Sequence, residues 1–522
     1  MENEFLADWG LTLLVFTPLI GVAIMALIPR ESEGAHKMVS FAATIVTAAV
    51  GIALFVDFDY DRAGELQFVK DRSWIDLINS RYILGLDGLS LPLIALTLFI
   101  VPLVLIYSWN HIPEPGNPKA FLMLILILHT GMLGSFVAQD LILFFVFFEV
   151  VLLPMYFMIG VWGGPERQYA SIKFFLYTLF GSALMIISFL ALFFLSDTSL
   201  VPGFDTALGE NTFDMRALPT AVSAISSGTA LWIFGGMFMG FGIKVPMFPF
   251  HTWLPDAHTQ APTQGSVILA AVLLKLGTYG FVRIAIPILP EAAKSWAPWI
   301  GGLAVIGIIY GALGCLAQTD MKRLIAFSSV AHMGYVMLGI STLTELGINA
   351  AVFGMVAHGL ITGMLFFVAG SIKERYHTLE IKRLGGLLKQ APRMGWILGM
   401  CTMASLGLPG LAGFWGEFPA IMSAYNPAEG LNVELFRFYM VVAALGTVLA
   451  AGYLLWLYQR TTFGTPSEEF EHDPEITDMG GAEAIAWAPI LVAIVLFGVV
   501  PGIILDITDP AISSLLGAIV ER

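Results

Sequence analysis

The chain has 522 residues, of which 57% are hydrophobic and only 12% are charged, with 25 basic against 39 acidic side chains. A soluble domain carries about 25% charged residues, so this composition excludes an ordinary soluble protein and indicates a polytopic membrane protein. The net charge of −14 also argues against nucleic acid as a partner, because phosphates require basic patches. The two cysteines, Cys315 and Cys401, lie in apolar runs and cannot supply the ligands of an iron–sulfur cluster.

Apolar runs long enough to cross a bilayer follow one another along almost the whole chain. A hydrocarbon core of about 30 Å needs roughly 20 residues per helix, and by this criterion we predict about fourteen spans. In chain order they are Trp9–Ile28, Met38–Val56, Leu86–Tyr107, Ala120–Val137, Leu141–Val161, Tyr169–Leu195, Ser227–Phe248, Ala261–Ile286, Trp299–Ala317, Met321–Ile340, Gly347–Ile372, Gly395–Ala424, Phe436–Tyr458 and Ile485–Leu505. These runs are too long for barrel strands, so we expect an all-α fold without membrane strands.

Basic residues gather in the connections on one side of the predicted spans. The basic residues on this side are Arg30 and Lys37, Arg167 and Lys173, Lys322 and Arg323, and a group between 373 and 393. By the positive-inside rule this side is cytoplasmic, and both termini then lie on the outer side. The longest outer connections are predicted at 58–81 and 196–226.

The most informative charged residues inside predicted spans are Glu149, Lys244, Lys275 and Glu417. A charge at the bilayer centre costs at least about 2.5–3.5 kcal/mol, so such residues usually face a partner or a wet cavity. A structural ion pair between helices would explain one of them. Four acid and base residues in four spans favour a path for protons.

Two of these charges adjoin helix breakers. Lys244 is followed by Pro246, and Glu417 comes shortly after Pro409 and Gly410. Proline removes a backbone donor, and interrupted spans in membranes line buried or wet cavities. A plain proline kink is the simpler alternative, but a break beside a charge occurs twice. Paired interrupted spans are typical of transport sites.

The interrupted spans are the seventh and the twelfth, so they run in opposite directions across the bilayer. We therefore predict an inverted-topology repeat of five helices, with spans four to eight in one copy and nine to thirteen in the other. The corresponding segments are 1–114, 115–290 for the first copy, 291–465 for the second copy, and 466–522 for the last loop and helix.

Histidines in the spans could pass protons between these charges, because an imidazole titrates near neutral pH. His332 and His358 lie in spans ten and eleven, between Lys275 and Glu417 in helix order, and we predict that they act as relays. His129 in span four is more simply a packing residue. The segment with His251, Asp256 and His258 could suggest a metal site, but this spacing is not specific, and we prefer a structural role or one in proton uptake.

Three segments carry a resemblance to a known family. They are GIKVPMFPFHTWLPDAHTQAPTQGSVILAAVLLKLGTYG at 242–280, FFEVVLLPMYFMIGVWGG at 147–164 and GFWGEF at 413–418. The first resembles the signature of the antiporter-like subunits of respiratory complex I and of Mrp-type cation/proton antiporters. The other two are similar to the subunit M branch, in which a glutamate occupies a position that the sister subunits L and N usually fill with lysine.

This resemblance implies a proton-translocating membrane-arm subunit of NADH:quinone oxidoreductase in the bacterial cytoplasmic (inner) membrane. The enzyme's FMN, iron–sulfur clusters, NADH and quinone would be bound by other subunits, and the partners would be the bilayer and the other membrane subunits, especially L and N. It also implies that Glu149 pairs with Lys244, that Lys275 is the central connecting lysine, that Glu417 is the outer exit, and that His358 is a relay histidine between them. His332 is not among the residues that the resemblance supports directly.

Two other functions stay open from the sequence. The chain could be a subunit of an Mrp-type sodium/proton antiporter, which the same motifs fit. A structural membrane scaffold is disfavoured, because a scaffold gains nothing from buried charge.

Overall fold

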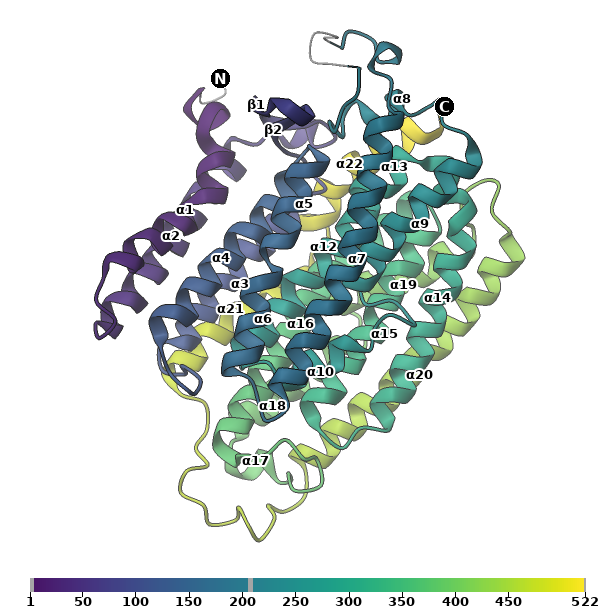
Figure 1. Ribbon diagram of the computed structural model, residues 1–522. Coiled ribbons are helices and arrows are strands. Elements are labelled where there is room, and N and C mark those ends of the chain that lie inside the picture. The colour runs from purple at the N-terminus through teal and green to yellow at the C-terminus, as the bar shows by residue number, and fades with distance from the viewer. Residues whose placement is uncertain (1–3, 205–209, 521–522) are drawn as a thin grey trace.

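The computed structural model describes residues 4–204 and 210–520, and it shows a bundle of long helices with one small hairpin at its end (Figure 1). Twelve helices in these residues are long and apolar enough to cross a membrane. They are Leu6–Leu27, which includes α1 (Leu11–Leu27), α2 (Glu33–Asp57), α3 (Leu91–Ser108), α4 (Pro118–Val137), α5 with α6 (Leu141–Val150 and Leu152–Trp162), α7 (Arg167–Leu195), the segment Thr263–Ile288, α14 (Pro290–Leu316), α15 (Met321–Ser341), α16 (Glu345–Tyr376), α20 (Val433–Thr462) and α21 (Gly481–Val499). The all-α membrane fold predicted from the sequence is thus confirmed.

Predicted spans seven and twelve are both interrupted. In the seventh, α9 (Ser227–Lys244) ends in a turn at 245–252, and the second helix, α10 (Trp253–Gln260), lies beyond the predicted end at Phe248. The twelfth consists of α18 (Pro392–Ser405), a turn at 406–412 and α19 (Gly413–Ser423). In the second turn Gly407 and Gly410 have φ angles of +71° and +91°, a left-handed conformation that favours glycine. Both breaks lie where the prolines predict them, whereas the total of fourteen spans, the segment boundaries and the inverted repeat stay predictions.

The most deeply buried spans are those at the centre of the bundle. Every residue of the most apolar window of α16 is buried, against 28% of that window in α2 at the edge (Figure 1). The edge helices α1, α2, α7 and α20 turn large apolar side chains outward, as expected of a surface that faces lipid. Helix α16, which carries His358, therefore lies in the core with α15 and the segment Thr263–Ile288.

The segment Thr263–Ile288 is not a uniform α-helix. It consists of α11 (Thr263–Ile268), α12 (Leu274–Gly280) and α13 (Ile286–Ile288), joined by π-helical turns at Leu269–Leu273 and Phe281–Ala285. Such π-turns widen a helix locally and are frequent at functional sites. Lys275 is the second residue of α12, directly after the first π-turn.

The predicted outer connection at 58–81 contains strands, which the sequence analysis did not anticipate. Strands β1 (Gln67–Ile75) and β2 (Ser80–Leu86) form an antiparallel hairpin outside the spans. Asp71 on β1 accepts from Arg81 and from Arg216, each at 2.7 Å, so the hairpin is tied to the connection near 216. Both chain ends lie at this same end of the bundle (Figure 1).

The C-terminal part differs from the prediction of a last span at 485–505. Helix α21 ends at Val499, the chain turns at Val500 and Pro501, and α22 (Gly502–Val520) then packs on α16 and α13. Pro501 lacks an amide donor, which accounts for the break. Thr508 donates to Asn349 at 2.6 Å, and Asn349 donates to Asp509 at 2.7 Å, so α22 is fixed to α16 by polar contacts.

Short elements complete the described structure. They are α8 (Leu218–Ala221), α17 (Leu387–Gln390) and three 3₁₀ turns at Tyr60–Arg62, Asp76–Ile78 and Thr198–Leu200.

Candidate functional site

Four of the six predicted site residues form two direct pairs in the core. Lys275 on α12 contacts His358 on α16, with 2.7 Å between Nζ and Nδ1. His332 on α15 contacts Glu417 on α19, with 2.5 Å between Nδ1 and Oε1. The two imidazole rings are neighbours, tilted by 60° to each other, with 6.0 Å between their centroids. In space the order is Lys275, His358, His332 and Glu417, whereas in helix order His332 comes before His358.

The first pair is fully enclosed by the bundle. Lys275 is 0% exposed, and its amine also donates to the carbonyl of Ala270 in the preceding π-turn at 2.5 Å. A charged lysine amine has donors and no acceptor, so Nδ1 of His358 must accept this proton. Nε2 of His358 has no hydrogen-bond partner within the described chain, and it is thus available to a further group.

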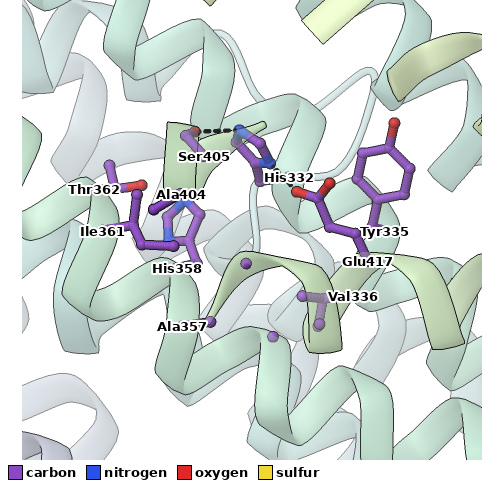
Figure 2. A pocket seen from close by; sticks show the side chains of 13 residues that line it. His332, Tyr335, Val336, Ala357, His358, Ile361, Thr362, Ala404, Ser405 and Glu417 are labelled. Atoms are coloured by element: carbon purple, nitrogen blue, oxygen red, sulfur yellow. Dashed lines mark hydrogen bonds and ion pairs between the residues drawn. The ribbon is translucent and has the colours of Figure 1, made fainter. Parts of the chain in front are cut away.

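The second pair is held from both sides of the second helix break. Ser405, the last residue of α18, lies 3.0 Å from Nε2 of His332, while Glu417 of α19 lies at Nδ1. Figure 2 shows Ser405, His332 and Glu417 in a row, with His358 close to His332. The hydroxyl of Tyr453 also approaches Nε2, at 3.5 Å. Each ring nitrogen of His332 thus has a partner that can exchange a proton.

A small cavity of about 20 Å³ lies between the two pairs. His332, His358, Thr362, Ser405 and Glu417 contribute polar atoms to its wall (Figure 2). A site of this size and polarity has room for about one water molecule. The cavity therefore offers a short polar connection from Nε2 of His358 to the His332–Glu417 pair.

The predicted pair of Glu149 and Lys244 is not joined by an ion pair in the described residues. The amine of Lys244 is buried without a hydrogen-bond partner there and lies 4.4 Å from the ring centroid of Phe148, which gives it a cation–π contact. The carboxylate of Glu149 instead accepts from the hydroxyl of Ser182 on α7. Each charge thus contacts another group in this conformation, although the two are close enough to act on each other electrostatically.

The remaining predicted histidines do not form a metal centre. Asp256 forms ion pairs with Lys173 at 2.7 Å and with Arg323 at 3.6 Å. His258 stacks on Phe366, and neither of its ring nitrogens has a partner within residues 4–204 and 210–520. Over the same residues, no group of three or more His, Cys, Asp and Glu side chains could hold a metal ion. His129 is buried and likewise unpartnered in this part of the chain.

Sequence reasoning missed several polar residues of the core. Asp87 and Arg283 form a buried ion pair at 2.6 Å, although Asp87 lies at the edge of a predicted span and could have been noticed. Ser405 and Ser182 contact site residues, but a serine in a membrane helix is too common to be a signal by itself. Lys322 lies at the predicted cytoplasmic start of span ten and yet is 2% exposed.

These observations define a class: a polytopic membrane protein with interrupted helices and a buried line of residues that can exchange protons. The family model described as NADH:quinone oxidoreductase/Mrp antiporter, TM, matches residues 138–445, and the model for the amino terminus of NADH-ubiquinone oxidoreductase chain 4 matches residues 65–135. The chain belongs to this family, in the subunit M and chain 4 group, which confirms the resemblance predicted from the sequence.

Similar proteins cover the chain almost completely. NADH-quinone oxidoreductase subunit M of Rhodobacter capsulatus is 40% identical over 97% of this chain and 96% of that protein. NADH-ubiquinone oxidoreductase chain 4 of Arabidopsis thaliana is 37% identical, with 97% of each chain covered. A chain of respiratory complex I from Thermus thermophilus aligns with a TM-score of 0.83 and 29% identity over 97% of this chain and all of that one.

A more distant likeness concerns the fold alone. A chain of the Mrp complex from Dietzia sp. aligns with a TM-score of 0.79 at 21% identity, covering 97% of this chain and 52% of that chain. The full-length similarity at 37–40% identity is to subunit M and chain 4.

Proposed function

We propose that the chain carries protons across the membrane through the line Lys275, His358, His332 and Glu417. Family membership makes it an antiporter-like, proton-translocating membrane-arm subunit of NADH:quinone oxidoreductase, and the assignment of individual residues is our proposal. The observation that carries it is the pair of direct contacts, at 2.7 Å and 2.5 Å, that face each other in the core. Buried ionisable residues in contact across helices are typical of proton relays.

Each transfer in the proposed sequence has a donor and an acceptor. Protonated Lys275 gives its proton to Nδ1 of His358, and His358 gives the proton on Nε2 to a water in the cavity. That water protonates His332, which passes a proton to the carboxylate of Glu417. Release from Glu417 to the outer side restores its carboxylate. Lys275 regains its ammonium form by taking a new proton from the cytoplasmic side, and the two imidazoles return to their starting tautomers before the next cycle.

Glu149 and Lys244 are proposed as a switch that controls this line. They carry opposite charges on neighbouring helices α5 and α9, but each is held by another group, Ser182 or Phe148. Closing the pair would stabilise the charge on both side chains, and opening it would drive a proton from Lys244 toward Lys275. In the conformation described here the pair is open, because Glu149 and Lys244 form no ion pair among the described residues.

The proposed setting follows from charge and family. The end of the bundle with α17 carries the basic residues at 373–393, so we place it in the cytoplasm and both termini outside a bacterial inner membrane (Figure 1). FMN, iron–sulfur clusters, NADH and quinone would be bound by other subunits. The direct neighbours would be the sister subunits L and N and the bilayer.

The test uses the assembled complex in sealed inverted vesicles. Lys275→Met removes the titratable group, and Lys275→Arg keeps the charge but cannot release a proton, because a guanidinium stays protonated in proteins. Both variants should lower NADH-driven proton uptake per electron by about tenfold or more. An assembled Lys275→Arg complex with the wild-type proton-to-electron ratio would exclude the proposed line.

A further inference from the structure

Lys322 is buried although it lies at the cytoplasmic start of α15. Its side chain is 2% exposed, and its amine donates to the carbonyl of Ala261 at 2.5 Å. It forms no ion pair with a carboxylate among the residues that the structure describes. A buried amine is costly without a charged partner, and a cation in the first turn also opposes the helix dipole. Packing alone does not account for a lysine here.

A large polar cavity of about 540 Å³ at this end of the bundle has Lys322 in its wall. The connection at 110–114, the start of α7, the segment 260–264 and the end of α16 form the other walls. Their polar side chains include His111, Arg167, Gln260, Gln264, Lys373 and Glu374. The cavity is large enough for many water molecules, so it can bring cytoplasmic water to Lys322.

The wall of this cavity also contains a pair that can collect protons. Nδ1 of His111 lies 2.6 Å from Oε2 of Glu374, and both side chains are partly exposed. Tyr107 donates to the same carboxylate at 3.0 Å, and its ring stacks on the imidazole at 4.5 Å between centroids. An imidazole beside a carboxylate exchanges protons with water near neutral pH. His111 and Glu374 can therefore supply the cavity with protons.

On the inner side of Lys322, His258 provides the next group toward the central line. Its ring is buried against Phe366, with 4.4 Å between centroids, and its two nitrogens have no partner in the described part of the chain. Both Lys322 and Lys275 are close enough to act electrostatically on this ring. An unpartnered imidazole within electrostatic range of two buried lysines is a candidate to exchange a proton with each.

We propose that Lys322 is a proton carrier, which takes protons from the 540 Å³ cavity and passes them to His258 and so toward Lys275. The inference rests on the proposed function, whose line begins at Lys275. In the step itself the N–H bond of the Lys322 ammonium breaks and an N–H bond forms on neutral His258. A proton from cavity water then restores the ammonium.

Three variants of Lys322 separate a proton carrier from a structural lysine. Lys322→Arg keeps the charge and the donor to Ala261 but cannot release a proton, whereas Lys322→His can. Lys322→Met removes the charge and also the ability to release a proton. Lys389→Met on α17, an exposed lysine at the same end, is the matched control. Assembly is checked on native gels before proton uptake per electron is measured in inverted vesicles.

If Lys322 is a proton carrier, we expect the proton-to-electron ratio to fall about tenfold or more in Lys322→Arg and Lys322→Met. The ratio should recover in part in Lys322→His and stay unchanged in Lys389→Met. If Lys322→Arg pumps as well as Lys322→His or better, the lysine is structural and the inference is overturned. Lys275→Arg in the same assay separates the two proposals. If the proton-to-electron ratio falls in Lys275→Arg but stays at the wild-type value in Lys322→Arg, only the uptake route through Lys322 is rejected. If both variants keep the wild-type ratio, the central line is rejected.

Discussion

His332 and Glu417 are in direct contact across α15 and α19, with 2.5 Å between Nδ1 and Oε1. The other ring nitrogen of His332 faces Ser405 at 3.0 Å, on the opposite side of the helix break. The two halves of the interrupted span therefore hold one imidazole between them, and a shift of either half would alter its hydrogen bonds. This arrangement connects the break in the helix to the last proton transfer before Glu417.

The first prediction concerns Ser405. Ser405→Ala removes the partner of Nε2, and a hydrogen bond of about 1 kcal/mol corresponds to a roughly fivefold slower transfer through His332. Ser405→Thr should keep the hydroxyl and most of the rate. Thr402→Ala is the control, because Thr402 lies on the same helix and its hydroxyl has no partner in the described structure. Equal proton-to-electron ratios in Ser405→Ala and Thr402→Ala would show that Ser405 does not position His332.

The second prediction concerns the switch of Glu149 and Lys244. Glu149→Gln and Lys244→Ala should each leave assembly largely intact but abolish most of the NADH:quinone turnover that is linked to pumping. After either substitution the remaining charged side chain has no partner of opposite charge, so the ion pair of Glu149 and Lys244 cannot form. Turnover and acidification are measured together in sealed vesicles, with native gels as the check on assembly. Full pumping by an assembled Lys244→Ala complex would contradict the switch.

The third prediction concerns stability at the ion pair of Asp87 and Arg283. The side chain of Arg283 is 13% exposed and that of Asp87 is 6% exposed, so Asp87→Asn leaves a buried charge unpaired. This should cost about 3–5 kcal/mol and lower the temperature at which the subunit is lost from the complex. The double variant Asp87→Asn, Arg283→Gln should recover part of the loss.

A control pair for this prediction lies on the surface. Lys294 and Glu291 are 3.2 Å apart with exposed side chains, and Lys294→Ala should change little, because solvent screens such pairs. Equal effects of Asp87→Asn and Lys294→Ala in thermal assembly assays would refute the stabilising role of the buried pair.

The fourth prediction concerns orientation in the membrane. Both native cysteines are buried, so a single introduced cysteine can be labelled selectively. Glu65→Cys, near the hairpin, should react with a membrane-impermeant maleimide added from the outer side, and Glu468→Cys, in the last long connection, from the cytoplasmic side. The reverse pattern of labelling would invert the proposed direction of transport.

The residues that carry the fold and the central line were visible in the sequence for a physical reason. A charge or an imidazole within an apolar run is costly, so Lys275, His358 and Glu417 stand out against their neighbours. The prolines after Lys244 and before Glu417 likewise mark the two breaks. These signals are local, and they need no knowledge of which helices touch.

Contacts between helices could not be predicted in the same way. Nothing in the segment of His332 shows that Glu417 and Ser405 meet its two ring nitrogens. Neither segment shows that Lys275 and His358 are in direct contact. Lys322 lies at the cytoplasmic end of predicted span ten, and only the packing of the segment at 260–264 shows that it is buried.

The central claim is that Glu417 is the last proton site before the outer side. The most direct test is the proton-to-electron ratio of the assembled Glu417→Gln complex in sealed vesicles, with Glu417→Asp as its partner variant. The account predicts a ratio lowered by about tenfold or more in Glu417→Gln, because an amide cannot accept the proton from His332, and partial retention in Glu417→Asp. A wild-type ratio in Glu417→Gln would contradict it and would move the exit to another residue.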